Sequence, residues 1–144
     1  MNTRTFVTFQ WQPREEPKRD PYDSVFILPP GLELLAYLRR SLEQREFSTT
    51  SPYSDHASDL AFGIESGGVR VCCVVKEGQP SLLATEVQGR SKSSPERRNP
   101  ISEHSRVCAA LHECLSNSGR ATAVRWYTRR DFEQGNVEAG ADRP

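Results

Sequence analysis

The chain has 144 residues, of which 35% are hydrophobic and 26% are charged, and this length is typical of one domain with one core. Nineteen Lys and Arg balance nineteen Asp and Glu, so net charge does not favour nucleic acid or an anionic membrane as the main partner. No apolar run approaches the roughly 20 residues that cross a bilayer, and the first residues lack the apolar stretch of a secretion signal. We therefore expect a cytoplasmic protein with no membrane partner.

The first part of the chain predicts a strand, a loop and a helix. In 3–11, apolar residues alternate with polar ones, which is the period of a half-buried strand. Five of the ten prolines and a charged run fall in 12–30, so an irregular loop is expected there. A helix is expected over about 31–46, because leucines recur at spacings of three and four. These leucines are Leu34, Leu35, Leu38 and Leu42.

The middle of the chain predicts antiparallel strands. Residues 48–52 form a possible edge strand that Pro52 ends, because proline cannot donate to a ladder. Two stretches rich in strand-forming residues, 60–65 and 69–76, flank a pair of glycines at positions 67–68. A two-glycine turn between such stretches predicts a hairpin whose turn needs positive φ.

A third strand and a second helix are expected next. Residues 81–88 extend the hairpin into a meander, whereas 89–100 is polar, basic and rich in Ser and Pro, which predicts an irregular loop. A helix is expected over 102–117, with Ser102 as its N-cap and Gly119 as its stop. Its apolar face consists of Val107, Leu111, Cys114 and Leu115.

The chain ends with a predicted strand over 123–127 and a short helical turn, because Thr128 and Asp131 have the spacing of a capping box. Residues 134–144 contain one large aliphatic side chain and are expected to form a flexible tail. The order β-α-(β)-β-β-β-α-β over residues 1–133 predicts a single α+β domain. In this fold, a mainly antiparallel sheet carries both helices on one face.

Cysteine and histidine are the residues most suited to catalysis or metal binding. Cys72 and Cys73 are neighbours in a predicted strand and point to opposite faces, so they cannot share a metal. His104, Cys108 and His112 lie on one side of a predicted helix, but about 12 Å separates the outer pair. No nucleophile, phosphate-loop or dinucleotide motif is present. We therefore expect no metal, no cofactor and no catalytic residues, and interpret the protein as not an enzyme.

Charged residues are distributed unevenly along the chain. No Lys or Arg lies between Glu46 and Val69, and the acidic residues of this stretch predict an acidic side of the molecule. Arginines gather instead in 90–106 and 120–130, where they could meet phosphates. A nucleic-acid-binding domain is therefore kept as an alternative interpretation.

Four segments together resemble a known class of proteins. They are the helix GLELLAYLRRSLEQREF, the meander DLAFGIESGGVRVCCVVKEG, the helix beginning SEHSRVCAALHECL and the ending VRWYTRRDF. The pattern, over about residues 1–133, resembles small, largely uncharacterised bacterial α+β proteins that are similar to immunity proteins of polymorphic-toxin systems. The chain departs from that class at 58–62, where the class has a Trp near the start of the strand.

The resemblance implies a non-catalytic protein that binds and neutralises a cognate bacterial toxin; another protein-interaction or regulatory domain remains open. Specific interfaces bury roughly 800 Å² per partner around aromatic anchors, which makes three tyrosines candidate anchors. Acidic side chains could complement a basic toxin surface and speed encounter. The candidate partner-binding residues are Tyr22, Tyr53, Asp55, His56, Asp59, Glu65 and Tyr127.

Overall fold

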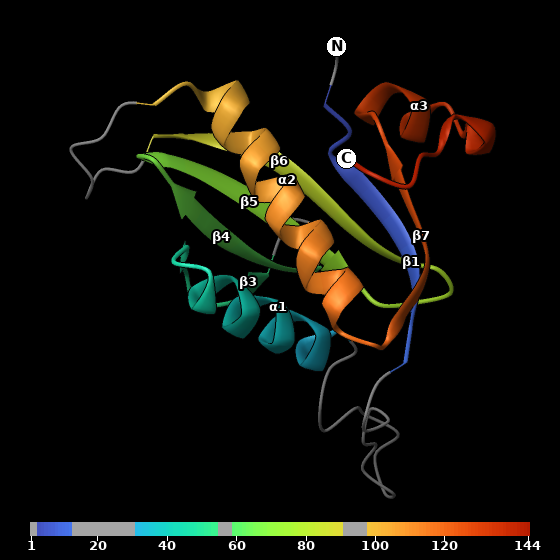
Figure 1. The fold of residues 1–144 in the computed structure, drawn as a ribbon, viewed down its shortest axis with the longest axis horizontal. Helices are drawn as coiled ribbons and strands as arrows, with labels where there is room; N and C mark the ends of the chain where they lie inside the picture. The colour runs from blue at the N-terminus through green and yellow to red at the C-terminus, as the bar shows by residue number, and fades with distance from the viewer. Residues whose placement is uncertain (1–2, 13–30, 55–58, 91–97) are drawn as a thin grey trace, which may run out of the picture.

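The fold is an antiparallel sheet with its two long helices on one face, as seen in a computed structural model that describes residues 3–12, 31–54, 59–90 and 98–144 (Figure 1). The strands follow the order β2-β4-β5-β6-β1-β7, and β3 also pairs with β4. Every strand pairing among these residues is antiparallel. The elements are β1 (Phe6–Trp11), α1 (Leu32–Gln44), β2 (Ser48–Thr49), β3 (Tyr53–Ser54), β4 (Leu60–Ser66), β5 (Val69–Lys76), β6 (Ser81–Arg90), α2 (Pro100–Asn117), β7 (Ala121–Tyr127), α3 (Arg129–Glu133) and the 3₁₀ helix η1 (Val137–Ala139).

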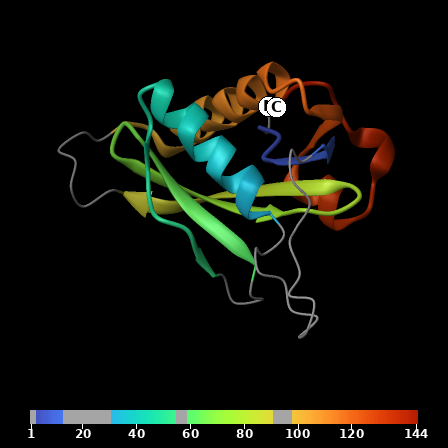
Figure 2. The same cartoon turned by 90° about the horizontal axis from the view of Figure 1, so that it is seen from below.

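Both long helices cover the same face of the sheet, as Figure 2 shows from a second direction. Helix α2 packs over β4, β5 and β6, and α1 lies beside it over β2 and β4. The predicted α+β fold, with two helices on one face of an antiparallel sheet, is therefore confirmed. None of the described helices combines the length and hydrophobicity that crossing a bilayer requires.

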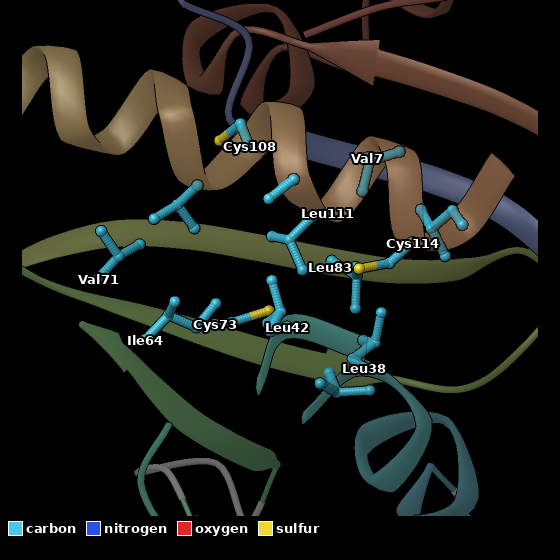
Figure 3. Close-up of a cluster of buried hydrophobic side chains, with 14 of the residues drawn as sticks. Val7, Leu38, Leu42, Ile64, Val71, Cys73, Leu83, Cys108, Leu111 and Cys114 are labelled. Carbon is cyan, nitrogen blue, oxygen red and sulfur yellow. The ribbon is translucent and has the colours of Figure 1, made fainter. Parts of the chain in front are cut away.

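The core lies between this sheet face and the two helices (Figure 3). The alternation of side chains along β5 explains why the core lies on this face. Val69, Val71 and Cys73 are buried, whereas the residues between them point to the other face. The leucine face predicted for α1 is also confirmed, because all four of its leucines are buried. The apolar faces of both helices therefore meet one face of the sheet.

The predicted hairpin joins β4 to β5, and its turn residues Gly67 and Gly68 have φ of 57° and 79°. The turn contacts the start of α2, where the carboxylate of Glu103 accepts a hydrogen bond of 2.6 Å from Ser66. Arg98 and Arg106 lie 3.7 and 3.8 Å from the same carboxylate. Glu103 is almost fully buried, so these groups offset the cost of removing its charge from water.

The N-terminus of α2 was predicted incorrectly. Its N-cap is Asn99 instead of Ser102, and the Asn99 side chain accepts hydrogen bonds from the backbone N–H of Ile101 and Ser102. Pro100 then occupies the first helical position, where a missing N–H costs little. The helix therefore begins two residues earlier than the sequence predicted.

Strand boundaries also differ from the prediction. The edge strand expected over 48–52 is present as β2, and a second short strand, β3, pairs with β4 beyond Pro52. Strand β6 continues to Arg90, into the segment predicted as a loop, because the register shift beside Gly89 lets pairing with β5 resume. The predicted loop over 12–30 lies almost entirely outside the described residues.

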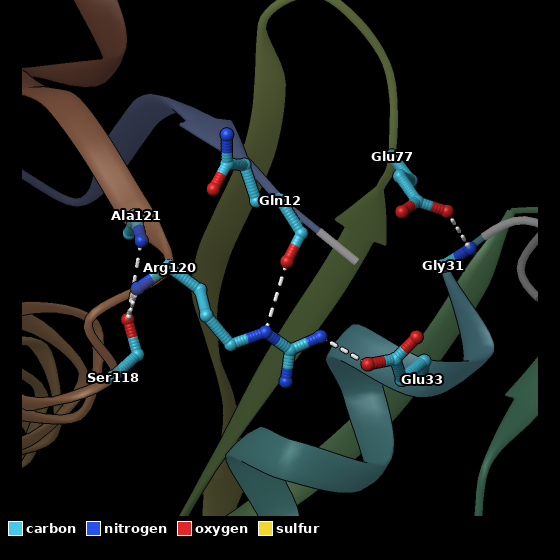
Figure 4. Close-up of polar contacts among 7 residues, drawn as sticks. All are labelled: Gln12, Gly31, Glu33, Glu77, Ser118, Arg120 and Ala121. Atoms are coloured by element: carbon cyan, nitrogen blue, oxygen red, sulfur yellow. Dashed lines mark hydrogen bonds and ion pairs between the residues drawn. The ribbon is translucent and has the colours of Figure 1, made fainter. Parts of the chain in front are cut away.

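A polar corner joins the ends of β1, α1 and β7 (Figure 4). Arg120 forms an ion pair with Glu33, donates a hydrogen bond of 2.9 Å to the backbone oxygen of Gln12 and stacks over the ring of Trp11. Ser118 accepts hydrogen bonds from the N–H groups of Arg120 and Ala121. Arg120 thus has a structural role in fastening three elements together.

The short helix predicted after β7 is confirmed as α3, and its N-cap is Thr128, whose Oγ1 accepts a hydrogen bond of 3.1 Å from the N–H of Asp131. The Asp131 carboxylate accepts a hydrogen bond of 3.0 Å from the Thr128 hydroxyl, whereas a capping box would use the Thr128 backbone N–H. In the segment predicted as a flexible tail, Val137–Ala139 forms η1, and Ala141 exchanges two backbone hydrogen bonds with Trp126. These bonds place the tail along the outer edge of β7. The flexibility of the tail stays a prediction.

Candidate functional site

The sheet face opposite α1 and α2, which we call the helix-free face because neither long helix covers it, carries a row of apolar side chains. The row runs across the strands because these residues stand opposite one another in the register. Side chains that are partners on neighbouring strands share a face of the sheet. The row consists of Ala61, Val74, Ala84, Phe6 and Tyr127.

Charged and polar residues surround this row. On β4 and β5, Glu65 pairs with Arg70 at 2.6 Å, and Asp59 pairs with Lys76 at 3.3 Å. On the other side, Arg129 lies 3.5 Å from Glu86. The apolar row and these charged pairs together form an apolar centre with a charged rim, which is the usual anatomy of a protein interface.

The short helix α3 covers one end of the helix-free face with the ring of Phe132. The ring of Phe132 lies 5.0 Å from that of Phe6 and 6.1 Å from that of Tyr127, measured between centroids. Two cavities open beside this contact. One, of about 340 Å³, is lined by Cys72, Val74, Ala84, Glu86, Gln88 and Arg129, among others. The second, of about 300 Å³, lies between the sheet and α3.

The predicted anchor Tyr53 lies on the helix-free face, since it stands opposite Ala61 in the register. Its side chain is 38% exposed, and its hydroxyl oxygen lies 3.1 Å from Cys72 Sγ and 3.4 Å from Gln88 Nε2. Tyr127 lies at the other end of the same row but is only 7% exposed, because Phe132 packs on it. The structure therefore places both tyrosines on one face.

The predicted acidic side is not a single patch among the described residues. Asp59 and Glu65 lie at opposite ends of β4, about 20 Å apart at 3.3 Å per residue, and each is paired with a basic residue. The remaining predicted site residues, Tyr22, Asp55 and His56, lie outside the described residues. The part that any of these residues plays in binding stays a prediction.

The three buried thiols are poorly suited to nucleophilic chemistry. Burial raises the pKa of Cys108 to about 11, against the smaller opposing effect of a hydrogen bond with Thr85. Burial also raises the pKa of Cys73 and of Cys114. These three thiols are therefore protonated at neutral pH, and a protonated thiol is neither a nucleophile nor a good metal ligand.

The two histidines of α2 serve as partners of buried groups. His104 Nε2 lies 2.8 Å from Thr85 Oγ1, and His112 Nδ1 accepts a hydrogen bond of 3.0 Å from the indole N–H of Trp126. Burial lowers the pKa of both histidines. Of the described residues, no three His, Cys, Asp or Glu side chains are grouped so that they could hold a metal.

The arginines of 90–106 and 120–130 that the structure describes do not converge on one surface. Arg98 and Arg106 contact Glu103 at the start of α2, whereas Arg120, which contacts Glu33, lies just beyond the end of α2. An 18-residue helix is about 27 Å long, so these groups lie far apart. Arg129, in turn, bonds with Glu133 at 2.9 Å. The arrangement gives little support to the nucleic-acid alternative.

Sequence reasoning missed the residues at the centre of the helix-free face. Two signals in the sequence could have identified members of this surface. Val74 lies within the apolar run 71–75 and breaks the alternation of β5, and Phe6, next to the buried Val7, breaks that of β1. An apolar residue at an outward position of a strand indicates a second contact surface. Phe6 and Ala84 belong to the same surface, but only the strand register brings them beside Val74.

No protein-family model, curated protein or solved structure matches the chain.

Proposed function

We propose that this protein is a non-catalytic binding protein that uses the helix-free face to hold a protein partner. The observation that carries the proposal is the apolar row between Ala61 and Tyr127, which crosses five strands and has charged pairs around it. The half-buried members of the row, Phe6, Val74 and Ala84, gain from further burial, and a charged rim favours one orientation of a partner.

The partner that best fits the sequence is a bacterial toxin, which the protein would neutralise as an immunity protein. This part of the proposal depends on the resemblance of the four segments described above. An immunity protein acts by occupying a surface of its toxin, so it needs a complementary face and no reactive group of its own. The raised pKa of the buried thiols agrees with such a role.

The test is a growth assay in which the product of the adjacent gene is expressed with and without this protein. The proposal expects that the adjacent gene product inhibits growth alone and that co-expression restores growth. The two proteins should also co-purify in equal amounts. A gene product that is harmless alone, or that stays toxic although this protein is expressed and folded, contradicts the immunity role.

A further inference from the structure

We propose that the cavity between α3 and the sheet, which we call the α3 cavity, receives an arginine side chain from the protein partner. This inference rests on the proposed function, because the α3 cavity opens on the helix-free face. Its lining combines two aromatic rings, one carboxylate and one amide. Its lining includes Thr8, Tyr127, Asp131, Phe132, Asn136 and Val137.

The α3 cavity has the size of a single side chain. Its volume of about 300 Å³ is at the lower limit of ligand pockets, which span roughly 300–1,000 Å³. Val137 lies at the cavity and is 72% exposed. It is one of few large apolar residues that are exposed to solvent among the described residues. A partner that covered Val137 would bury apolar surface and close the cavity from water.

The charge of the lining favours a cation. Asp131 is the one charged residue in the lining, and among the described residues it forms no ion pair. One of its oxygens accepts a hydrogen bond of 3.0 Å from the hydroxyl of Thr128, which fixes the carboxylate and leaves its other oxygen for a further donor. Arg125 stands opposite Thr8 in the register but is not part of the lining; its Nε lies beside Gly140, as the Tyr127 hydroxyl does.

The aromatic rings favour arginine over lysine. The rings of Tyr127 and Phe132 both line the α3 cavity and contact each other edge to face, with centroids 6.1 Å apart and an interplanar angle of 64°. A guanidinium group is planar, weakly hydrated and able to stack on a ring while it donates hydrogen bonds to a carboxylate. An ammonium group is a compact, strongly hydrated charge and loses more when it leaves water.

The experiment titrates the free protein with N-acetyl-L-arginine methylamide and follows the backbone amides by NMR. The expected result is a shift of the amides of 131–137, with saturation in the millimolar range. The citrulline analogue has nearly the same shape without the charge, and it should bind about ten-fold more weakly or worse. Equal shifts with citrulline, or arginine-induced shifts confined to another surface, would overturn the inference.

Two variants assign the binding to the carboxylate. Asp131→Asn keeps an acceptor for Thr128 and keeps the N–H that Thr128 caps, so α3 is retained. Asp131→Asn should weaken arginine binding by about ten-fold or more. The control is Glu138→Gln, which removes an exposed charge on the neighbouring η1 and should leave arginine binding unchanged. Equal effects of the two variants would contradict the inference.

The same experiment separates this inference from the proposed function. If arginine fails to bind but a substitution at the apolar row still weakens the toxin complex, only the α3 cavity loses its role. If arginine binds at the α3 cavity while the adjacent gene product neither inhibits growth nor co-purifies, the immunity role falls and the cation site stands.

Discussion

His104 and His112 link the stability of the protein to pH, because each is held neutral in a partly buried place. Burial is the main cause of the lowered pKa of both residues, and the nearby charge of Arg143 adds to the effect at His112. At His112 the neutral ring is also needed to accept the bond from Trp126. Protonation of Nδ1 would remove that bond and leave the buried indole N–H without its partner.

The sign of the pH dependence follows from these shifts. An unfolded chain binds protons at the ordinary histidine pKa of about 6.5, and the folded protein binds them at a lower pH. The free energy of unfolding is therefore expected to be fully retained above that ordinary pKa and to fall as the pH is lowered below it. Urea unfolding at pH 7.5 and pH 5.5 measures the loss.

The histidine contribution can be isolated by substitution. A His104→Gln/His112→Gln variant cannot titrate at these positions, and glutamine keeps an acceptor for Trp126. This variant should lose clearly less stability between the two pH values than the wild type. An equal loss in both proteins would show that other groups, such as the carboxylates, cause the pH dependence.

Residues whose role depends on partners far along the chain were beyond sequence reasoning. Glu103 looks like an ordinary helix acid, and only the fold brings Ser66 to within 2.6 Å of its carboxylate. Asn99 was missed as an N-cap for a different, local reason, since Ser102 satisfies the same preference for a capping residue. Local propensity cannot choose between two capping residues three positions apart.

At the scale of an element, the stability of α1 on the sheet depends on its leucine face. Leu38 is fully buried, whereas Arg40 on the same helix is exposed. Leu38→Ala should lower the free energy of unfolding by about 2–5 kcal/mol, because it removes buried methyl groups and leaves a cavity. Arg40→Ala should change it by less than about 0.5 kcal/mol. Comparable losses in denaturant unfolding would contradict the assigned faces of the helix.

The hairpin between β4 and β5 offers a second test. Gly67 and Gly119 both have positive φ, but a Cβ at Gly67 would lie 2.5 Å from Arg98 Cδ and 2.9 Å from the Glu103 side chain, whereas the space at Gly119 is open. Gly119→Ala should cost about 1–2 kcal/mol from backbone conformation alone. Gly67→Ala should cost at least about 1 kcal/mol more, because Glu103 must also move. Equal losses in thermal or urea unfolding would show that the turn does not contact α2 closely.

The elements themselves were predictable where one physical signal dominated. Period-two burial in β1 and β5, the leucine spacing of α1 and the glycine pair of the hairpin all reflect local geometry. Strand β3 lacks such a signal, because two residues are too few to show a period and Pro52 precedes them. Its pairing with β4 is set by tertiary structure.

At the scale of the whole molecule, the candidate site follows from the strand register. Phe6, Val74, Ala84 and Tyr127 are spread over more than 120 positions, and they become neighbours only because β1 lies between β6 and β7. A sequence pattern can show that each residue is apolar, but it does not give the strand order. The fold class was therefore within reach of the sequence, whereas the helix-free face was not.

The most direct test of the account places the same charge on two faces of the molecule. Ala84 lies in the apolar row, and Ala109 is exposed on α2, so Ala84→Lys and Ala109→Lys make a matched pair. The affinity of each folded variant for the adjacent gene product is measured by calorimetry. Ala84→Lys should weaken binding by about ten-fold or more, since a charge would be buried in the centre of the interface, and Ala109→Lys should bind as the wild type does. Unchanged affinity in Ala84→Lys, or a loss confined to Ala109→Lys, would contradict binding through the helix-free face.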